Sequence, residues 1–278
     1  MYKNPYGSVA LITGASSGIG YETAHKLAKL GFRVYGGSRR GGESIRYDEG
    51  AINMLQLDVT EEESIKRAVD EILEKEGRID ILINCAGIGI AGAVEDCSGE
   101  EALRQMDVNY AGTLRMIRMV VPFMRARGNG LIINIGSVGG VFSIPFQTLY
   151  SSSKFAVEAL TEGLRIELKP WGVKAALVEP GDVRTGFTAA RIYAKDCKTT
   201  AYGARFTQSI KQMEHDELHG KAPDAVVKVI LQTIRSKNPP VRRTVGGMYK
   251  VLVFLKRILP SRLVEALLDM MYPKSNVK

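Results

Sequence analysis

The stretch Thr13-Gly-Ala-Ser-Ser-Gly-Ile-Gly20 joins an apolar run, Val9–Ile12, to a helical pattern that extends from Ile19 to Leu30. A glycine-rich loop between a strand and a helix is the context that a dinucleotide-binding loop requires. The N-terminus of the following helix presents free N–H groups and the positive end of a dipole to a pyrophosphate. This stretch therefore predicts a strand, a phosphate-binding turn and a helix.

The three glycines of this loop have separate roles. Gly14 permits the tight turn, Gly18 allows close approach of the backbone to a ligand, and Gly20 permits the helix to pack on the strand. The alternative is an ordinary Gly/Ser turn, but the strand–loop–helix context favours the dinucleotide interpretation.

Apolar runs and helical patterns alternate over the first two-thirds of the chain. This alternation predicts an α/β fold, with parallel strands joined by right-handed helical crossovers on both faces of one sheet. Thr60 and Glu63 resemble a capping box, and one long helix over 100–127 is expected to bend near Pro122. Further strands are expected at 32–35, 52–57, 79–83, 131–135, 173–178 and 241–247, and further helices at 149–168 and 223–236.

The composition is that of a globular protein. The chain has 278 residues, 45% of them hydrophobic and 24% charged, which excludes collagen, coiled coil and general disorder. No apolar run is long enough to span a membrane, and no signal peptide is recognised. The three cysteines and three histidines show no metal-ligand spacing, so free thiols, no metal and a cytoplasmic location are expected.

The positive charge is concentrated at the end of the chain. The formal net charge is +8, yet residues 221–278 hold 12 basic and 3 acidic residues, whereas residues 1–220 hold 26 and 27. A neutral body argues against nucleic-acid binding and directs any electrostatic partner to the tail.

Several motifs occur in an order that identifies a family. The loop has the form TGxxxGxG, and it is followed by Asp58-Val59, Asn84-Cys-Ala-Gly87, Asn109, Ser137, Tyr150-Ser-Ser-Ser-Lys154 and Pro180-Gly181. Over about residues 8–190 the chain resembles the short-chain dehydrogenase/reductase family. The resemblance implies a single-domain, Rossmann-type, doubly wound parallel sheet with a C-terminal helical extension.

The resemblance also implies a catalytic set. Tyr150 and Lys154 are four residues apart and project from one helix face. A tyrosine with a pKa near ~10 must shift by roughly three units, or about 4 kcal/mol, to exchange a proton near neutrality, and a nearby ammonium favours that shift. Ser137 would orient the substrate carbonyl, and Asn109 would hold a water beside Lys154. Each residue alone could be incidental, but all four occur at the family spacing.

The second strand is followed by Gly36-Gly-Ser-Arg-Arg40, which has no carboxylate to bind a ribose. Ser38, Arg39 and Arg40 offer donors instead, so the resemblance favours NADP(H), with Arg39 on the 2′-phosphate. The alternative is a solvated loop. Asp58 and Val59 would contact the adenine, although Asp58 could simply precede a helix as a capping acid. Further cofactor contacts are expected from Ser16, Ser17, Ile19, Asn84, Ala86, Gly87, Tyr150, Lys154, Pro180, Gly181, Val183 and Thr185.

Two segments follow the motifs. Residues 186–220 occupy the position of the family's substrate loop, and their aromatic content suits either a pocket wall or ordinary core packing. Residues 248–272 are basic and amphipathic, interrupted by Pro260. This tail could contact a membrane peripherally, cover the pocket or form a subunit interface. Residues 1–247 are expected to form the catalytic domain, and residues 248–278 the tail.

These features predict an NADP(H)-dependent enzyme that interconverts a ketone and a secondary alcohol on a hydrophobic, steroid-like or lipid-like substrate. Within the family, the chain resembles the branch of hydroxysteroid, retinol and acyl-dihydroxyacetone-phosphate reductases. The resemblance also implies that the chain assembles into a homodimer or homotetramer. One alternative is a 3-oxoacyl-thioester reductase. Another is a non-catalytic NADP(H)-sensing or membrane-associated binding protein, which would need no proton relay.

Overall fold

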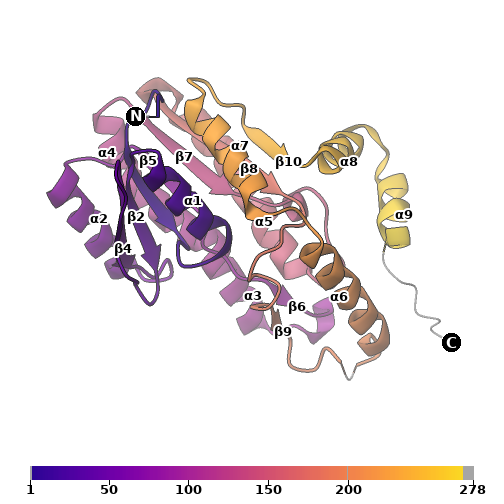
Figure 1. Cartoon of the computed structure of the whole chain (residues 1–278). Coiled ribbons are helices and arrows are strands. Elements are labelled where there is room, and N and C mark those ends of the chain that lie inside the picture. The colour runs from indigo at the N-terminus through magenta and orange to yellow at the C-terminus, as the bar shows by residue number, and fades with distance from the viewer. Residues whose placement is uncertain (1, 199, 272–278) are drawn as a thin grey trace.

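The fold is built on one twisted sheet. The computed structural model describes residues 2–198 and 200–271, and its main sheet has the strand order β10-β8-β7-β5-β1-β2-β4-β3 (Figure 1). Every neighbouring pair is parallel except the short β3–β4 pair. The strands are β1 Val9–Thr13, β2 Arg33–Ser38, β3 Ile45–Arg46, β4 Ala51–Gln56, β5 Ile81–Asn84, β7 Gly130–Ile135, β8 Val173–Pro180 and β10 Arg242–Val245. The predicted Rossmann-type sheet is confirmed.

Helices cover both faces of this sheet. The helices α1 Gly18–Lys29 and α7 Pro223–Arg235 share one hydrophobic core with the sheet. The helices α2 Glu62–Glu76, α4 Gly112–Ala126 and α5 Thr148–Glu167 form the core on the opposite face. The central strands are therefore buried on both faces, as in β1, whose five residues are all buried.

The segment after β8 has its own small core. The helix α6 Gly203–Leu218 packs Phe206 and Ile210 against Ala91 and Ala194. These two alanines belong to or follow a two-stranded parallel sheet of β6 Ile90–Ala91 and β9 Ile192–Tyr193. Residues of the predicted substrate segment thus join the loop after β5 to form one lobe beside the sheet.

The predicted long helix is confirmed as one helical run over residues 99–126, although it contains a turn that was not foreseen. It consists of α3 Gly99–Met106, a turn of π-helix over Asp107–Ala111 and α4, which contains Pro122. The divergence from α-geometry thus lies at Asp107–Ala111. A π-turn carries an extra residue and is common at functional sites, but no apolar spacing reveals it.

The capping box is also at a different place. Thr60 does not cap α2, because its N–H and hydroxyl both donate to Asp58 Oδ1, at 2.9 and 2.7 Å. The capping box forms instead at the start of α3, where Ser98 and Glu101 exchange side-chain and backbone bonds. Asp58 offers Thr60 a charged acceptor two residues away, which competes with the helix N-terminus.

Two helices extend beyond β10. These are α8 Gly247–Ile258 and α9 Ser261–Met271, here called the arm, which projects from the edge of the sheet (Figure 1, yellow). No helix in the described part of the chain is long and apolar enough to cross a membrane. The last residues of the predicted tail, 272–278, lie outside the described residues.

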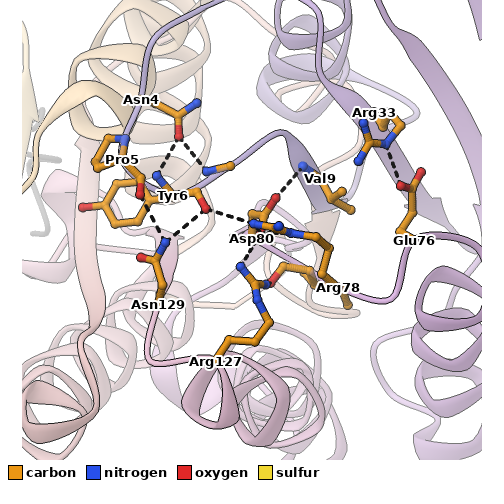
Figure 2. Close-up of polar contacts among 12 residues, drawn as sticks. Asn4, Pro5, Tyr6, Val9, Arg33, Glu76, Arg78, Asp80, Arg127 and Asn129 are labelled. Atoms are coloured by element: carbon orange, nitrogen blue, oxygen red, sulfur yellow. Dashed lines mark hydrogen bonds and ion pairs between the residues drawn. The ribbon is translucent and has the colours of Figure 1, made fainter.

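The amino-terminal edge of the sheet is closed by a charged network. Asp80 is fully buried, and it accepts hydrogen bonds from the N–H of Val9 at 3.0 Å, from Arg78 at 2.7 Å and from Arg127 at 2.8 Å (Figure 2). Two guanidinium groups and a backbone donor compensate for the desolvation of this carboxylate. The network ties β1 to the loops that precede β5 and β7.

Candidate active site

A cavity of about 400 Å³ opens at the carboxyl edge of the sheet. Its walls come from the loops that follow β1, β5, β7 and β8 and from α5, α6 and the arm. Open α/β sheets bind ligands at this edge. The loop glycines and the side chains of Ser137, Tyr150 and Lys154 all line it, so the structure brings these predicted residues together.

Tyr150 and Ser137 form the reactive pair of this cavity. Burial, with a smaller contribution from the carboxylate of Glu217, raises the pKa of Tyr150 to about 12, although a hydrogen bond with Ser137 and the charge of Arg191 oppose this shift. The Ser137 hydroxyl accepts from the N–H of Gly139 at 3.0 Å, which leaves its hydrogen free to donate. The phenol is therefore protonated at neutral pH.

Lys154 lies one helical turn after Tyr150 on α5. Its Nζ donates to the carbonyl oxygen of Ile135 at 2.8 Å and lies 5.8 Å from the centroid of the Tyr150 ring. Burial lowers the pKa of Lys154 to about 8. The amino group of Lys154 thus lies close to the phenol ring, and its own pKa is nearer to neutral pH than that of an exposed lysine.

Asn109 has every polar atom of its side chain bound to protein. Its Oδ1 accepts from the N–H of Ile88 at 2.9 Å, and its Nδ2 donates to the carbonyl of Ile88 at 3.0 Å and to Ser153 Oγ at 2.9 Å. A Cβ added at Gly87 would lie 3.3 Å from Asn109 Oδ1 and 4.0 Å from Lys154 Nζ. Asn109 therefore lies behind the cavity wall, close to Lys154, and it holds the loop after β5 against α5.

The glycine-rich loop has the geometry of a cradle. Gly14 and Gly18 have positive φ values of 68° and 56°, which glycine adopts without strain. A Cβ at Gly14 would lie 3.0 Å from the backbone N of Ala86, and one at Gly20 would lie 2.3 Å from the carbonyl oxygen of Gly14. Ser17, Gly18, Ile19 and Gly20 line the cavity, whereas Ser16 is exposed and is not part of this lining. This cradle fits the pyrophosphate of a dinucleotide.

The last residue of β5 carries an acceptor that lacks a donor among the described residues. Asn84 Nδ2 donates to Asn134 Oδ1 at 2.8 Å across β5 and β7. Its own Oδ1 is buried without a hydrogen-bond partner among the described residues, and such a group costs about 1–3 kcal/mol. Asn84 is buried and is not among the residues that line the cavity, so this predicted cofactor contact lies behind the cavity wall. The next residue, Cys85, has a thiol pKa raised to about 12 by burial, so it packs as a small apolar group, as expected.

The expected adenosine end is a separate hollow of about 350 Å³. Arg39 lines it, and Arg40 is exposed nearby on the same loop. Sequence reasoning missed Arg67 of α2, which lines the same hollow with Asp58, Glu61 and Glu63. Only the fold could reveal this second guanidinium, because no short spacing links it to Arg39.

Three other predicted contacts at this end already have protein partners. The Ser38 hydroxyl donates to the carbonyl of Gly41 at 2.7 Å, and Asp58 Oδ1 binds Thr60. Val59 is buried in the core cluster under α4. Of these three residues Asp58 lines the hollow, whereas Ser38 and Val59 do not, and Arg39 and Arg67 are the cationic side chains in its lining.

The loop after β8 packs against the arm. Pro180, Gly181, Val183 and Thr185 all line the cavity. A Cβ at Gly181 would lie 2.1 Å from the Tyr249 ring of α8, so only glycine allows this close packing. The Tyr249 hydroxyl also hydrogen-bonds Asp182. Of the three roles considered for the tail, the structure shows pocket cover: the arm lines the cavity through Tyr249, Leu252, Leu255, Lys256, Leu259, Val264, Leu267 and Leu268.

A polar group on the lobe was also missed. Glu217 of α6 lines the cavity, accepts from Thr188 Oγ1 at 2.6 Å and pairs with the buried Arg191. Asp216 lines the cavity beside it. Neither residue belongs to a motif, and the sequence alone left open whether this segment forms an apolar pocket wall or ordinary core packing. The cavity is therefore apolar with acidic groups on the α6 side.

Comparison with known proteins agrees with this geometry. The family model of the short chain dehydrogenases matches residues 8–195. The chain is 42% identical over 266 residues to the 3-ketodihydrosphingosine reductase of Bacteroides thetaiotaomicron, covering 95% of this chain and 97% of that protein. It is 33% identical over 254 residues to human 17-beta-hydroxysteroid dehydrogenase type 1, covering 84% and 76%. The solved structure of ElxO with NADP bound is 25% identical with a TM-score of 0.70, covering 88% and 99%.

Proposed function

This chain belongs to the short-chain dehydrogenase family, and on that premise we propose that it reduces a long-chain ketone with NADPH. The carrying observation is the apolar cavity that ends on the Tyr150–Ser137 pair. The family makes the chain an oxidoreductase of CH–OH and C=O groups. We propose, beyond this reaction class, that the cofactor is NADP(H) and that the substrate is a long-chain ketone.

The chain's own residues handle the proton and the developing charge. Ser137 donates to the substrate carbonyl oxygen and fixes its place beside Tyr150. Tyr150, which its buried position keeps protonated, gives its proton to that oxygen as the carbonyl carbon is reduced. The Lys154 ammonium beneath the ring stabilises the phenolate that remains. A bound reduced nicotinamide supplies the hydride, and alcohol oxidation reverses these roles.

The cofactor proposal rests on the cradle and the guanidinium groups. Gly14, Gly18 and Gly20 would hold the pyrophosphate, as their close contacts indicate. Arg39 and Arg67 would bind the 2′-phosphate of NADP(H) in the hollow that they share. Glu61 and Glu63 in the same lining oppose that phosphate, so the two arginines must outweigh them.

Two observations favour a lipid-like amino ketone as substrate. The relative with 42% identity is named for 3-ketodihydrosphingosine, a long-chain ketone that carries an amino group. The cavity is lined by apolar side chains of the arm and by Asp216 and Glu217 of α6. Because Arg191 neutralises Glu217, Asp216 is the carboxylate better placed to attract a substrate ammonium.

The 3-oxoacyl-thioester reductase and the non-catalytic sensor are the rival functions. NADPH oxidation is measured with a long-chain 3-ketone with and without its amino group, a steroid ketone and a 3-oxoacyl thioester. We expect the amino ketone to have the highest kcat/KM. A preference for the thioester supports the first rival. Tight NADPH binding without turnover of any ketone supports the sensor.

We also propose the homodimer or homotetramer that the family resemblance implies, with residues 1–247 as the catalytic domain and the arm as its extension. Sedimentation equilibrium at micromolar concentration measures the assembly. A monomer over the whole concentration range would contradict it.

A further inference from the structure

The helix α8 is apolar on two adjoining sides, as the 100° step between successive helical residues shows. Leu252, Leu255 and Leu259 face inward and line the cavity. Met248, Val251, Phe254 and Ile258 lie three to four residues apart, and between 56% and 64% of each is exposed. We call these four residues the outer stripe. The inward side is explained by the substrate cavity, whereas the outer stripe faces solvent.

The outer stripe continues onto α9. Leu263 is 47% exposed and Met270 is 68% exposed. Burial of apolar surface contributes about 25 cal/mol per Å², and exposed apolar residues that cluster mark interaction sites more often than scattered ones do. The arm therefore presents one apolar surface to the substrate and another to a partner.

Charges on the arm indicate the chemistry of that partner. Lys250, Arg257 and Arg262 are exposed on the arm, and the exposed acid Glu265 opposes only part of this charge. Asp269 is ion-paired with Arg205 of α6. In a two-fold contact between copies the same patch meets itself, so these cations would face one another. Anionic lipid headgroups would instead neutralise them while the apolar side chains enter the acyl boundary.

We infer that the arm docks on an anionic phospholipid surface through the outer stripe. Its helices have 12 and 11 residues, so each is too short to span a bilayer and would lie in the interface. Since the adjoining side of α8 lines the cavity, docking places the cavity wall at the lipid surface. A long-chain substrate then passes from the bilayer along the arm without crossing water. This loading step rests on the proposed function, whereas the docking itself does not.

Vesicle co-sedimentation of the full chain tests the docking. The probes are vesicles of phosphatidylcholine alone and vesicles containing 30% phosphatidylglycerol. We expect binding to the anionic vesicles, weakened by salt, and at least tenfold weaker partition for the double variant Val251→Glu/Phe254→Glu. Leu103→Glu on α3, which also changes a highly exposed leucine, is the matched control and should bind like the wild type.

A charge-reversal pair sharpens the test. Lys250→Glu/Arg257→Glu should lose binding to anionic vesicles, whereas Lys228→Glu, an exposed lysine on α7, should keep it. Failure of the wild-type chain to bind anionic vesicles overturns the inference. So does equal loss in the control variants, or an outer stripe that is covered by a second copy, seen as a dimer that Phe254→Glu dissociates.

Turnover separates this inference from the proposed function. The Val251→Glu/Phe254→Glu variant should reduce a short, water-soluble ketone at the wild-type rate, because neither side chain lines the cavity. Its rate on a long-chain ketone held in anionic vesicles should fall about tenfold. Equal rates on the vesicle substrate contradict the loading step. Absence of turnover on both substrates in the wild type contradicts the proposed function and leaves the docking result unchanged.

Discussion

The two edges of the main sheet bury charged groups in opposite ways. At the amino edge, Asp80 is compensated by two guanidinium groups and a backbone N–H. At the carboxyl edge, burial lowers the pKa of Lys154 and raises that of Tyr150, and Asn84 Oδ1 lacks a donor among the described residues. The satisfied edge contributes stability. The unsatisfied edge holds the groups that would bind the ligand, transfer the proton and stabilise the charge that develops.

The largest expected effect is loss of turnover at the carboxyl edge. Tyr150→Phe removes the only atom that gives the proton to the substrate oxygen, so kcat should fall by about 10²- to 10⁴-fold. Its melting temperature and NADPH binding should stay close to those of the wild type. Steady-state kinetics, thermal unfolding and fluorescence titration of NADPH measure the three quantities. A variant that keeps a tenth of the wild-type kcat would refute the assigned role.

Asp80 should show the converse behaviour. Asp80→Asn leaves Arg78 and Arg127 without their shared anion, and we expect a loss of about 2–4 kcal/mol in the free energy of unfolding. Urea unfolding measures this loss, while kcat at low temperature should change less than twofold. Asp70→Asn breaks an exposed i,i+4 pair on α2 and should cost under ~0.5 kcal/mol. Equal losses of unfolding free energy in the two variants would show that the buried Asp80 network contributes no more stability than an exposed ion pair.

Cofactor choice should depend on the adenosine end alone. Arg39→Ala should raise the KM for NADPH by about tenfold or more, because a charge-assisted bond to a phosphate contributes about 1.5–3 kcal/mol. The KM for NADH should hardly change. Arg67→Ala should act in the same direction, and their double variant more strongly. An equal change for both cofactors would show that Arg39 does not contact the 2′-phosphate.

The smallest effect concerns pH. Burial and the neighbouring carboxylate of Glu179 raise the pKa of Glu158 on α5, against the opposing charge of Arg242. A carboxyl with a raised pKa holds its proton more tightly in the folded chain, so its stabilising contribution is present at low pH. That contribution is lost as pH rises through the folded-state pKa.

Glu158→Gln should therefore flatten the fall in stability between pH 5 and pH 8. Melting temperatures across this range measure the slope, and Glu162→Gln, an exposed neighbour on the same helix, serves as the control. An unchanged slope in the Glu158 variant would show that this carboxyl is ionised throughout the range.

Sequence patterns predicted what depends on local chemistry. The Gly14–Gly20 loop needs glycines at particular backbone positions, and the alternating apolar runs reflect strands that are buried on both faces. Both the loop and the strands could therefore be predicted from the sequence. The four-residue spacing of Tyr150 and Lys154 placed them on one helix face, as the structure confirms.

Other features depend on contacts between distant segments. The π-turn at Asp107–Ala111 follows from bonds between Asn109 and the loop at Ile88. Arg67 meets Arg39 only because α2 returns beside β2 and β4. Tyr249 reaches Gly181 because β10 joins the sheet beside β8. No short sequence window contains these pairs, and for that reason the pocket-covering role of the tail stayed one of three alternatives.

The measurement that bears most directly on the central claim is NADPH oxidation with a long-chain 3-ketone, compared between the wild type, Tyr150→Phe and Asp80→Asn. We predict turnover in the wild type, a loss of at least a hundredfold in Tyr150→Phe and near-normal turnover in folded Asp80→Asn. Wild-type protein that binds NADPH but reduces no ketone would contradict the assignment of the carboxyl edge. So would Tyr150→Phe with undiminished turnover.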